Sequence, residues 1–286
     1  MKRSKHRRRL RRAVLVLALL AFGWFENYTV RLQTVRIFAP RLPAAFSGLR
    51  VAQLSDLHGM HFGPKNAWLL RCVQNARPDL IALTGDLADA HTELDTLRPT
   101  LQALCRIAPV YFVTGNHEWV LPRARRQALF KLLDSCGVTR LENRYVPLRR
   151  GDATLWLAGV GDPNGPADQP APSALFAALR AEAGPDACIL LLAHRNDLLD
   201  TWAQLGADVV LCGHAHGGVV RLPGLGGLFG PQKTWLPEFD AGLFSRGGTQ
   251  MYVSPGLGTL RGLPLRLFDR PTVSLLVLTP EKAPET

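Results

Sequence analysis

Residues 49–58 read LRVAQLSDLH and contain the pattern that decides the fold. The aliphatic run from Leu49 to Leu54 is short and is typical of a buried β-strand. Two side chains that can bind a metal ion, Asp56 and His58, follow this run directly. The sequence therefore predicts a strand that ends in a loop carrying candidate metal ligands.

The same arrangement recurs along about 160 residues of the chain, with an apolar run followed by an oxygen or imidazole donor. The further predicted strands are Asp79 to Leu83, Val110 to Val113, Cys188 to Leu192 and Asp208 to Leu211, and they lead to Asp86, Asn116, His194 and His214. Each candidate ligand is expected at the point where a strand ends and a loop begins.

Stretches of helical length separate the first strands, and they are Asn66 to Ala76, Thr92 to Arg106 and Pro122 to Cys136. Strands that alternate with helices imply right-handed crossovers and a largely parallel sheet. Loops at the carboxyl ends of such strands converge on one rim, so residues far apart in sequence can meet there. Other strand-like runs extend the sheets, namely Thr154 to Val160, Val219 to Leu222, Gln250 to Ser254 and Thr272 to Leu278.

The candidate ligands offer carboxylate, carboxamide and imidazole donors but no thiolate, and they are Asp56, His58, Asp86, Asn116, His194, His214 and His216. Such donors suit Mn, Fe, Zn or Mg rather than a thiolate-rich structural zinc site. Their number exceeds what one ion needs, which favours two ions that share a carboxylate. Two cations about 3.5–4 Å apart clamp a phosphoryl oxygen and lower the pKa of a bridging water. The sequence therefore predicts hydrolysis of a phosphoester.

Five segments carry a resemblance to a known family. In order and spacing they resemble the signature blocks of calcineurin-like metallophosphoesterases, and they are Asp56-Leu57-His58, Gly85-Asp86, Gly115-Asn116-His117-Glu118, His194 and Gly213-His214-Ala215-His216. The resemblance extends from Leu49 to about Leu278. It implies an α/β fold in which two packed mixed β-sheets are flanked by helices, a four-layer αββα arrangement.

The resemblance also implies how the ligands divide between two divalent ions such as Mn²⁺, Fe²⁺/³⁺ or Zn²⁺. One ion would be held by Asp56, His58 and His216, the other by Asn116, His194 and His214, with Asp86 bridging. His117 would protonate the leaving oxygen or clamp the phosphate, and imidazole titrates near neutral pH as such a role requires. Relatives often have His-x-Pro in the fourth block, whereas this chain has His194-Arg195-Asn196.

Four residues outside the ligand set have weaker signals. Arg266 lies in a stretch that resembles one in membrane-anchored bacterial members, where it would bind substrate phosphate or form a structural ion pair. His61 follows the first block and is a candidate for touching substrate. Asp89 and Glu118 would either orient a ligand or serve as local caps.

Positive charge is concentrated at the N-terminus. Eight of the 34 Lys and Arg residues lie in the first twelve positions, so the remaining 26 nearly balance the 23 acidic residues. The run Ala13 to Phe25 is uncharged but covers only about 20 Å of helix, against a hydrocarbon core of about 30 Å. Aromatic residues at its end favour an uncleaved anchor, with a cleaved signal peptide as the alternative.

A bilayer is the partner favoured for the basic run, because an apolar segment follows it; a nucleic-acid-binding arm is the alternative. The positive-inside rule then predicts a cytoplasmic tail and an external catalytic domain. The resemblance to membrane-anchored bacterial members implies a bacterial cell membrane. The five cysteines have no Cys-x-x-Cys spacing and are expected to be buried thiols. The expected segments are a tail (1–12), an anchor helix (13–30), a connector (31–48), a metallophosphoesterase domain (49–280) and a second tail (281–286).

Together these features predict a membrane-tethered phosphodiesterase or pyrophosphatase with two metal ions, acting on a lipid or lipid-linked substrate and not on nucleic acid. The resemblance implies one alternative, hydrolysis of UDP-2,3-diacylglucosamine in lipid A biosynthesis, although that substrate lies on the cytoplasmic side. A catalytically silent metal-binding scaffold is an alternative of a different class. The sequence leaves the oligomeric state open.

Overall fold

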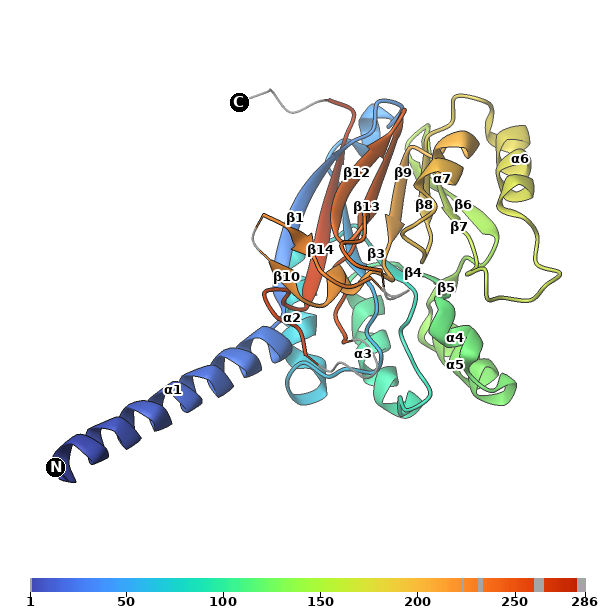
Figure 1. Ribbon diagram of the computed structural model, residues 1–286. Helices are drawn as coiled ribbons and strands as arrows, with labels where there is room; N and C mark the ends of the chain where they lie inside the picture. The colour runs from blue at the N-terminus through green and yellow to red at the C-terminus, as the bar shows by residue number, and fades with distance from the viewer. Residues whose placement is uncertain (1, 223, 231–233, 260–264, 282–286) are drawn as a thin grey trace.

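The computed structural model describes residues 2–222, 224–230, 234–259 and 265–281, and its main feature is a pair of six-stranded sheets (Figure 1). The first sheet has the order β1-β14-β2-β3-β4-β5. Its strands are β1 (Arg31–Phe38), β2 (Leu49–Leu54), β3 (Leu80–Thr84), β4 (Val110–Val113), β5 (Thr139–Arg140) and β14 (Thr272–Thr279). The second sheet has the order β12-β13-β9-β8-β7-β6. Its strands are β6 (Arg144–Arg150), β7 (Ala153–Gly159), β8 (Ile189–Leu192), β9 (Val209–Cys212), β12 (Gly242–Arg246) and β13 (Thr249–Val253).

Helices cover the outer face of the first sheet, in which β2, β3, β4 and β5 run parallel. These helices are α2 (Ala67–Ala76), α3 (Leu94–Ile107) and α5 (Arg123–Cys136). In α3 the apolar residues Leu97, Leu101 and Leu104 recur at the spacing of one helix face, and that face is buried against the sheet. The predicted βαβ pattern is confirmed in this half of the molecule.

A second core lies between the two sheets. Successive side chains of a strand point to opposite faces, so Val51 and Leu80 face the second sheet while Ala52 and Ile81 face the helices. Because both faces of these strands are covered, the strands are apolar runs rather than alternating patterns. This explains why the central strands are readable from sequence.

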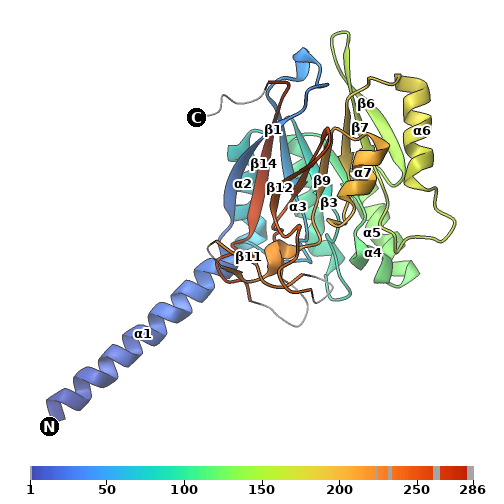
Figure 2. The same cartoon turned by 45° about the horizontal axis from the view of Figure 1, so that its top comes forward.

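The second sheet is covered on its outer face by α6 (Pro172–Ala183) and α7 (Leu199–Leu205), which contribute Phe176 and Trp202 to a third core. Strands β7, β8, β9 and β13 are parallel, and the edge strands β6 and β12 are antiparallel to their neighbours. The layers follow in the order helix, sheet, sheet, helix (Figure 2). The prediction of two packed mixed sheets flanked by helices is confirmed.

The N-terminal segment differs from the prediction. One continuous helix, α1 (Lys2–Tyr28), spans the predicted tail (1–12) and most of the predicted anchor (13–30). Within the described part of the chain, no helix combines the length and the apolar character needed to cross a membrane. The predicted apolar anchor is therefore not supported, nor is the membrane location inferred from it. The physical reason is the short uncharged run, about 20 Å against a hydrocarbon core of about 30 Å.

The predicted connector (31–48) is also corrected. Its residues form β1 and a short 3-10 helix, η1 (Ala44–Phe46), and β1 pairs with β14 along its whole length. The folded domain therefore begins at Arg31 rather than at residue 49. Of the predicted C-terminal tail (281–286), only Glu281 belongs to the described residues.

The last turn of α1 is attached to the domain. Asn27 Oδ1 accepts the backbone N–H of Arg266 at 2.7 Å, and Asn27 Nδ2 donates to the Arg266 carbonyl at 3.2 Å. Trp24 meets Trp68 of α2 edge to face, with ring centroids 6.1 Å apart. The rest of α1 projects away from the sheets (Figure 1).

Candidate active site

The candidate ligands lie on loops at the carboxyl ends of parallel strands from both sheets. Asp56, Asp86 and Asn116 follow β2, β3 and β4, whereas His194 and His214 follow β8 and β9. Backbone hydrogen bonds join the loops, for example from the N–H of His58 to the Asp86 carbonyl at 3.0 Å. The face-to-face packing of the sheets brings the two sets of loops to one rim.

Two donor clusters form there and share one carboxylate. In the first, His58 Nε2 lies 3.3 Å from His216 Nε2 and 3.7 Å from Asp86 Oδ2, and His216 Nε2 lies 3.5 Å from Asp56 Oδ1. The ligand atoms of these four residues lie within 4.8 Å of one another. This cluster is the group that the family resemblance assigns to the first ion, together with Asp86.

The second cluster is centred on His194. Its Nε2 lies 3.3 Å from Asp86 Oδ2, 3.1 Å from Asn116 Oδ1 and 3.2 Å from His214 Nδ1. On the opposite side of the ring, His194 Nδ1 lies 2.8 Å from the Thr84 carbonyl oxygen, which can only accept a hydrogen bond, so Nδ1 is the donor. The Nε2 atom therefore faces the cluster, and all seven predicted ligands converge at one place.

The charges of the clusters suit metal ions. Burial, reinforced by neighbouring positive groups, lowers the pKa of His58 to about 4, of His216 to about 3 and of His214 to about 2. These rings are thus neutral lone-pair donors near pH 7. Burial opposes a charge on His194, but the Asp86 carboxylate outweighs it and raises the pKa of His194 to about 10. A positive charge is stabilised at this point, as a site for two divalent cations requires.

The backbone at the ligands is strained. Asp56, His58, Asp86, His214 and His216 all have a positive φ, between 47° and 68°. Each residue held in this left-handed region costs on the order of 1–3 kcal/mol, and such residues concentrate at functional sites. These five residues lie on the three loops after β2, β3 and β9, and the packed sheets hold these loops in conformations that isolated loops would not keep.

Two motif glycines allow the ligands to approach closely. A Cβ on Gly213 would collide with Ser55 Oγ and with the Asp56 carboxylate. Gly85 has φ +90°, and a Cβ there would lie 2.5 Å from His194 Nδ1. Glycine is therefore required immediately before Asp86 and His214 because the neighbouring ligands occupy the space of a side chain.

His117 lies beside the clusters without belonging to either. Its Nε2 is 3.9 Å from Asp86 Oδ2, its ring stands edge to face on His58 with centroids 4.6 Å apart, and its side chain is 28% exposed. The backbone N–H of His117 donates to Asp86 Oδ1 at 2.8 Å. This position is next to the donors yet open to an incoming molecule.

Glu118 is a positioning residue that the sequence left ambiguous. It is fully buried at the start of α4 (Asn116–Val120), and its carboxylate accepts the backbone N–H groups of Asp86 at 2.9 Å, Gly115 at 2.8 Å and Ala88 at 3.1 Å. Burial and the nearby Asp86 charge raise the pKa of Glu118 to about 7. Glu118 therefore ties the loop after β3 to the loop after β4. Only its place beside His117 signalled this in the sequence.

Glu118→Gln is expected to destabilise the protein by about 1–3 kcal/mol, because the amide NH₂ would face a backbone N–H that then lacks an acceptor. Urea unfolding at about pH 8.5, where a carboxylate of this pKa is ionised, measures the change. Glu182→Gln is the matched control, since Glu182 accepts a hydrogen bond from the Tyr145 hydroxyl at a solvent-exposed place. Equal stability of the two variants would contradict the positioning role.

Two residues predicted to contact substrate, Arg266 and His61, lie outside the donor clusters. Arg266 is 1% exposed; its guanidinium donates to Asp269 Oδ2 at 2.6 Å and to the carbonyls of Pro255 and Gly258. Arg266 therefore stabilises the loop next to Asp56 and does not face a substrate. The predicted phosphate contact is not supported, whereas the alternative, a structural ion pair, is observed with Asp269. His61 is exposed on the loop after the first block, and a role in substrate contact stays a prediction.

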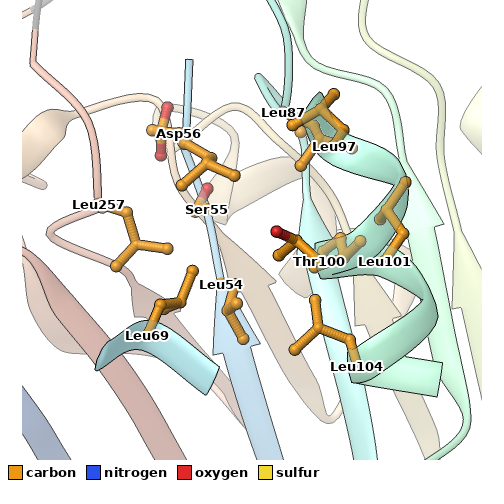
Figure 3. A pocket seen from close by; sticks show the side chains of 13 residues that line it. Leu54, Ser55, Asp56, Leu69, Leu87, Leu97, Thr100, Leu101, Leu104 and Leu257 are labelled. Atoms are coloured by element: carbon orange, nitrogen blue, oxygen red, sulfur yellow. The ribbon is translucent and has the colours of Figure 1, made fainter. Parts of the chain in front are cut away.

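The space around the site is of two kinds. A cavity of about 10 Å³ lies among the leucines of β2, α2 and α3, with the Asp56 carboxylate at its edge (Figure 3). It holds about one water molecule at most, so it supports Asp56 without admitting a ligand. A separate, open cleft of about 440 Å³ is lined by His214, and the segment 234–239 forms one of its walls. The cleft has the size of a ligand site.

Comparison with known proteins agrees with this geometry. The model of the calcineurin-like phosphoesterase family matches residues 49–218. Phosphodiesterase YaeI of Escherichia coli is 31% identical over 90% of this chain and 89% of its own. A zebrafish transmembrane protein with a metallophosphoesterase domain is 30% identical over 93% of this chain, which spans only 62% of that protein. The uncharacterized metallophosphoesterase YkoQ of Bacillus subtilis is 27% identical over 91% of this chain and 97% of its own. This chain belongs to the calcineurin-like phosphoesterase family.

Proposed function

We propose that this protein hydrolyses phosphodiester bonds at a site for two divalent metal ions. Membership of the family makes it a metal-dependent phosphoric ester hydrolase. The observation that carries the proposal is Asp86, whose Oδ2 lies 3.3 Å from His194 Nε2 and 3.7 Å from His58 Nε2. One carboxylate thus belongs to two donor clusters, as a bridging ligand must.

Metal binding and proton donation are assigned to different residues. Asp56, His58 and His216 would hold one ion and Asn116, His194 and His214 the other, with Asp86 shared. The ions supply Lewis acidity for the phosphoryl oxygens and lower the pKa of water near them. His117, which is partly exposed beside the clusters, donates a proton to the oxygen of the departing alcohol.

A diester with an apolar leaving group is the substrate class we propose. The name of the Escherichia coli relative is that of a phosphodiesterase. Beside the second cluster, Trp235 and Leu236 of the cleft wall are 70% and 54% exposed. Exposed apolar side chains at a concave site favour contact with an apolar part of a ligand. A lipid or lipid-linked phosphodiester has this combination of groups.

Turnover of bis(p-nitrophenyl) phosphate by protein loaded with Mn²⁺ tests the reaction. We expect release of p-nitrophenol that stops when EDTA removes the ion, and slower release from the monoester p-nitrophenyl phosphate. Paired phosphodiesters with long and short alkyl chains test the leaving group, and the long chain is expected to have the lower KM. A folded protein that is inactive with every divalent ion tried would instead favour a silent metal-binding scaffold.

A further inference from the structure

Arg195, which follows the ligand His194, is held rigidly at the edge of the site. Its Nε donates to Asp162 Oδ2 at 2.7 Å, and one terminal nitrogen donates to Asp162 Oδ1 at 3.1 Å. The Asp162 side chain is completely buried at the end of β7, whereas the Arg195 side chain is 16% exposed. A two-point ion pair with a buried carboxylate fixes the plane and direction of the guanidinium.

The remaining terminal nitrogen of Arg195 contacts a ring nitrogen of His214, one of the candidate metal ligands. It lies 3.1 Å from His214 Nε2, and the other ring nitrogen of His214, Nδ1, faces His194 Nε2 in the second cluster. If the Nδ1 lone pair serves the metal cluster, the proton of the neutral ring is on Nε2. Two donors then face each other, so the Arg195 N–H groups are available to an oxygen from outside the protein.

We propose that Arg195 binds a non-bridging oxygen of the substrate phosphate and that Asp162 orients it for this contact. The inference rests on the proposed function, since it assigns a residue to the same site. A fixed positive charge next to a cation site is unfavourable until an anion lies between them, and phosphate is the anion of this reaction. Arginine also matches the geometry of phosphate oxygens better than lysine does.

The surroundings of Arg195 are consistent with a substrate contact. His214, the residue that its free nitrogen meets, lines the open cleft of about 440 Å³. The next residue, Asn196, donates from Nδ2 to the Phe239 carbonyl at 2.6 Å and so holds the segment 234–239 that forms the cleft wall. Arg195 and Asn196 therefore connect the metal clusters to the cleft.

The test is direct binding of inorganic phosphate to the Mn²⁺-loaded full chain, measured by calorimetry together with metal content. Arg195→Gln is expected to weaken phosphate binding about 10- to 100-fold, the loss typical of a hydrogen bond to a charged group, with Mn²⁺ retained. Arg195→Lys keeps the charge but not the two-point geometry, and an intermediate loss is expected. Phosphate inhibition of turnover should weaken in the same order.

Arg140→Gln is the matched control, because Arg140 also makes a two-point contact with an aspartate, Asp134, but at an exposed place. It should bind phosphate like the wild type. Unchanged phosphate affinity in both Arg195 variants, with turnover intact in the wild type, would overturn this inference alone. Loss of Mn²⁺ from Arg195→Gln would overturn it too, because Arg195 would then be a brace for His214. Absence of both phosphate binding and turnover in the wild type would sink the proposed function as well.

Discussion

Asp86→Ala is expected to lose both metal ions and all measurable phosphodiester hydrolysis. The Asp86 carboxylate is the only group that belongs to both donor clusters among the described residues. Its removal takes a ligand from each cluster and leaves Asp56 as the one carboxylate of the first and only neutral donors in the second, whose attraction for a divalent cation is weaker than that of a carboxylate. Metal analysis of the purified variant, together with turnover of bis(p-nitrophenyl) phosphate, measures the effect.

Two companion variants separate metal loss from misfolding. In the wild type the backbone N–H of His117 donates to Asp86 Oδ1 at 2.8 Å. Asp86→Asn keeps an oxygen that can accept this hydrogen bond but removes the negative charge shared by the two clusters. We expect it to be folded and still inactive. Asp134→Ala, at an exposed aspartate, should retain metal and activity. Retention of one full ion equivalent by Asp86→Ala would show that the clusters bind independently and would contradict the bridging role.

His117→Ala is expected to slow turnover about 10²- to 10⁴-fold while metal content stays near that of the wild type. The reason is geometric: His117 Nε2 lies 3.9 Å from Asp86 Oδ2 but outside both ligand clusters, and its ring is partly open to solvent. Its removal therefore withdraws a proton donor and not a ligand. Metal analysis and kcat measured on the same preparation test both halves of the prediction.

The leaving group gives a sharper test of proton donation. An alkoxide needs a proton to depart, whereas p-nitrophenolate is stable without one. The defect of His117→Ala should therefore be much larger for an alkyl phosphodiester than for bis(p-nitrophenyl) phosphate. Equal defects for both substrates would indicate a phosphate clamp instead. Metal loss equal to that of Asp86→Ala would remove His117 from either role.

Much of the central fold is predictable from local sequence. The predicted strand Leu49 to Leu54 is β2, and the predicted strand Val110 to Val113 is β4. The predicted helix Pro122 to Cys136 begins one residue later, at Arg123. These elements are buried on one or both sides, so apolar patterning is strong, and Gly or Pro marks their ends.

The elements that were missed have polar or partly exposed sequences. In β1, the polar residues Arg31, Gln33 and Arg36 hide a strand whose partner, β14, lies some 240 positions away along the chain. Pairing over such a distance leaves no local signal. The length of α1 was missed for a related reason, because its basic half has no apolar face and reads as a solvated tail.

The sequence by itself determined the donor types, the strand-end position of each and the reaction class, because these follow from residue chemistry and local patterning. Only the tertiary structure decided how donors from two different sheets meet around Asp86. The tertiary structure also shows that Arg266 is buried in an ion pair and that Glu118 joins the loops after β3 and β4. It places Arg195 between Asp162 and His214. The physical reason is that these contacts join loops that are distant in sequence, and such loops meet only when the strands pair within a sheet and the two sheets pack on each other.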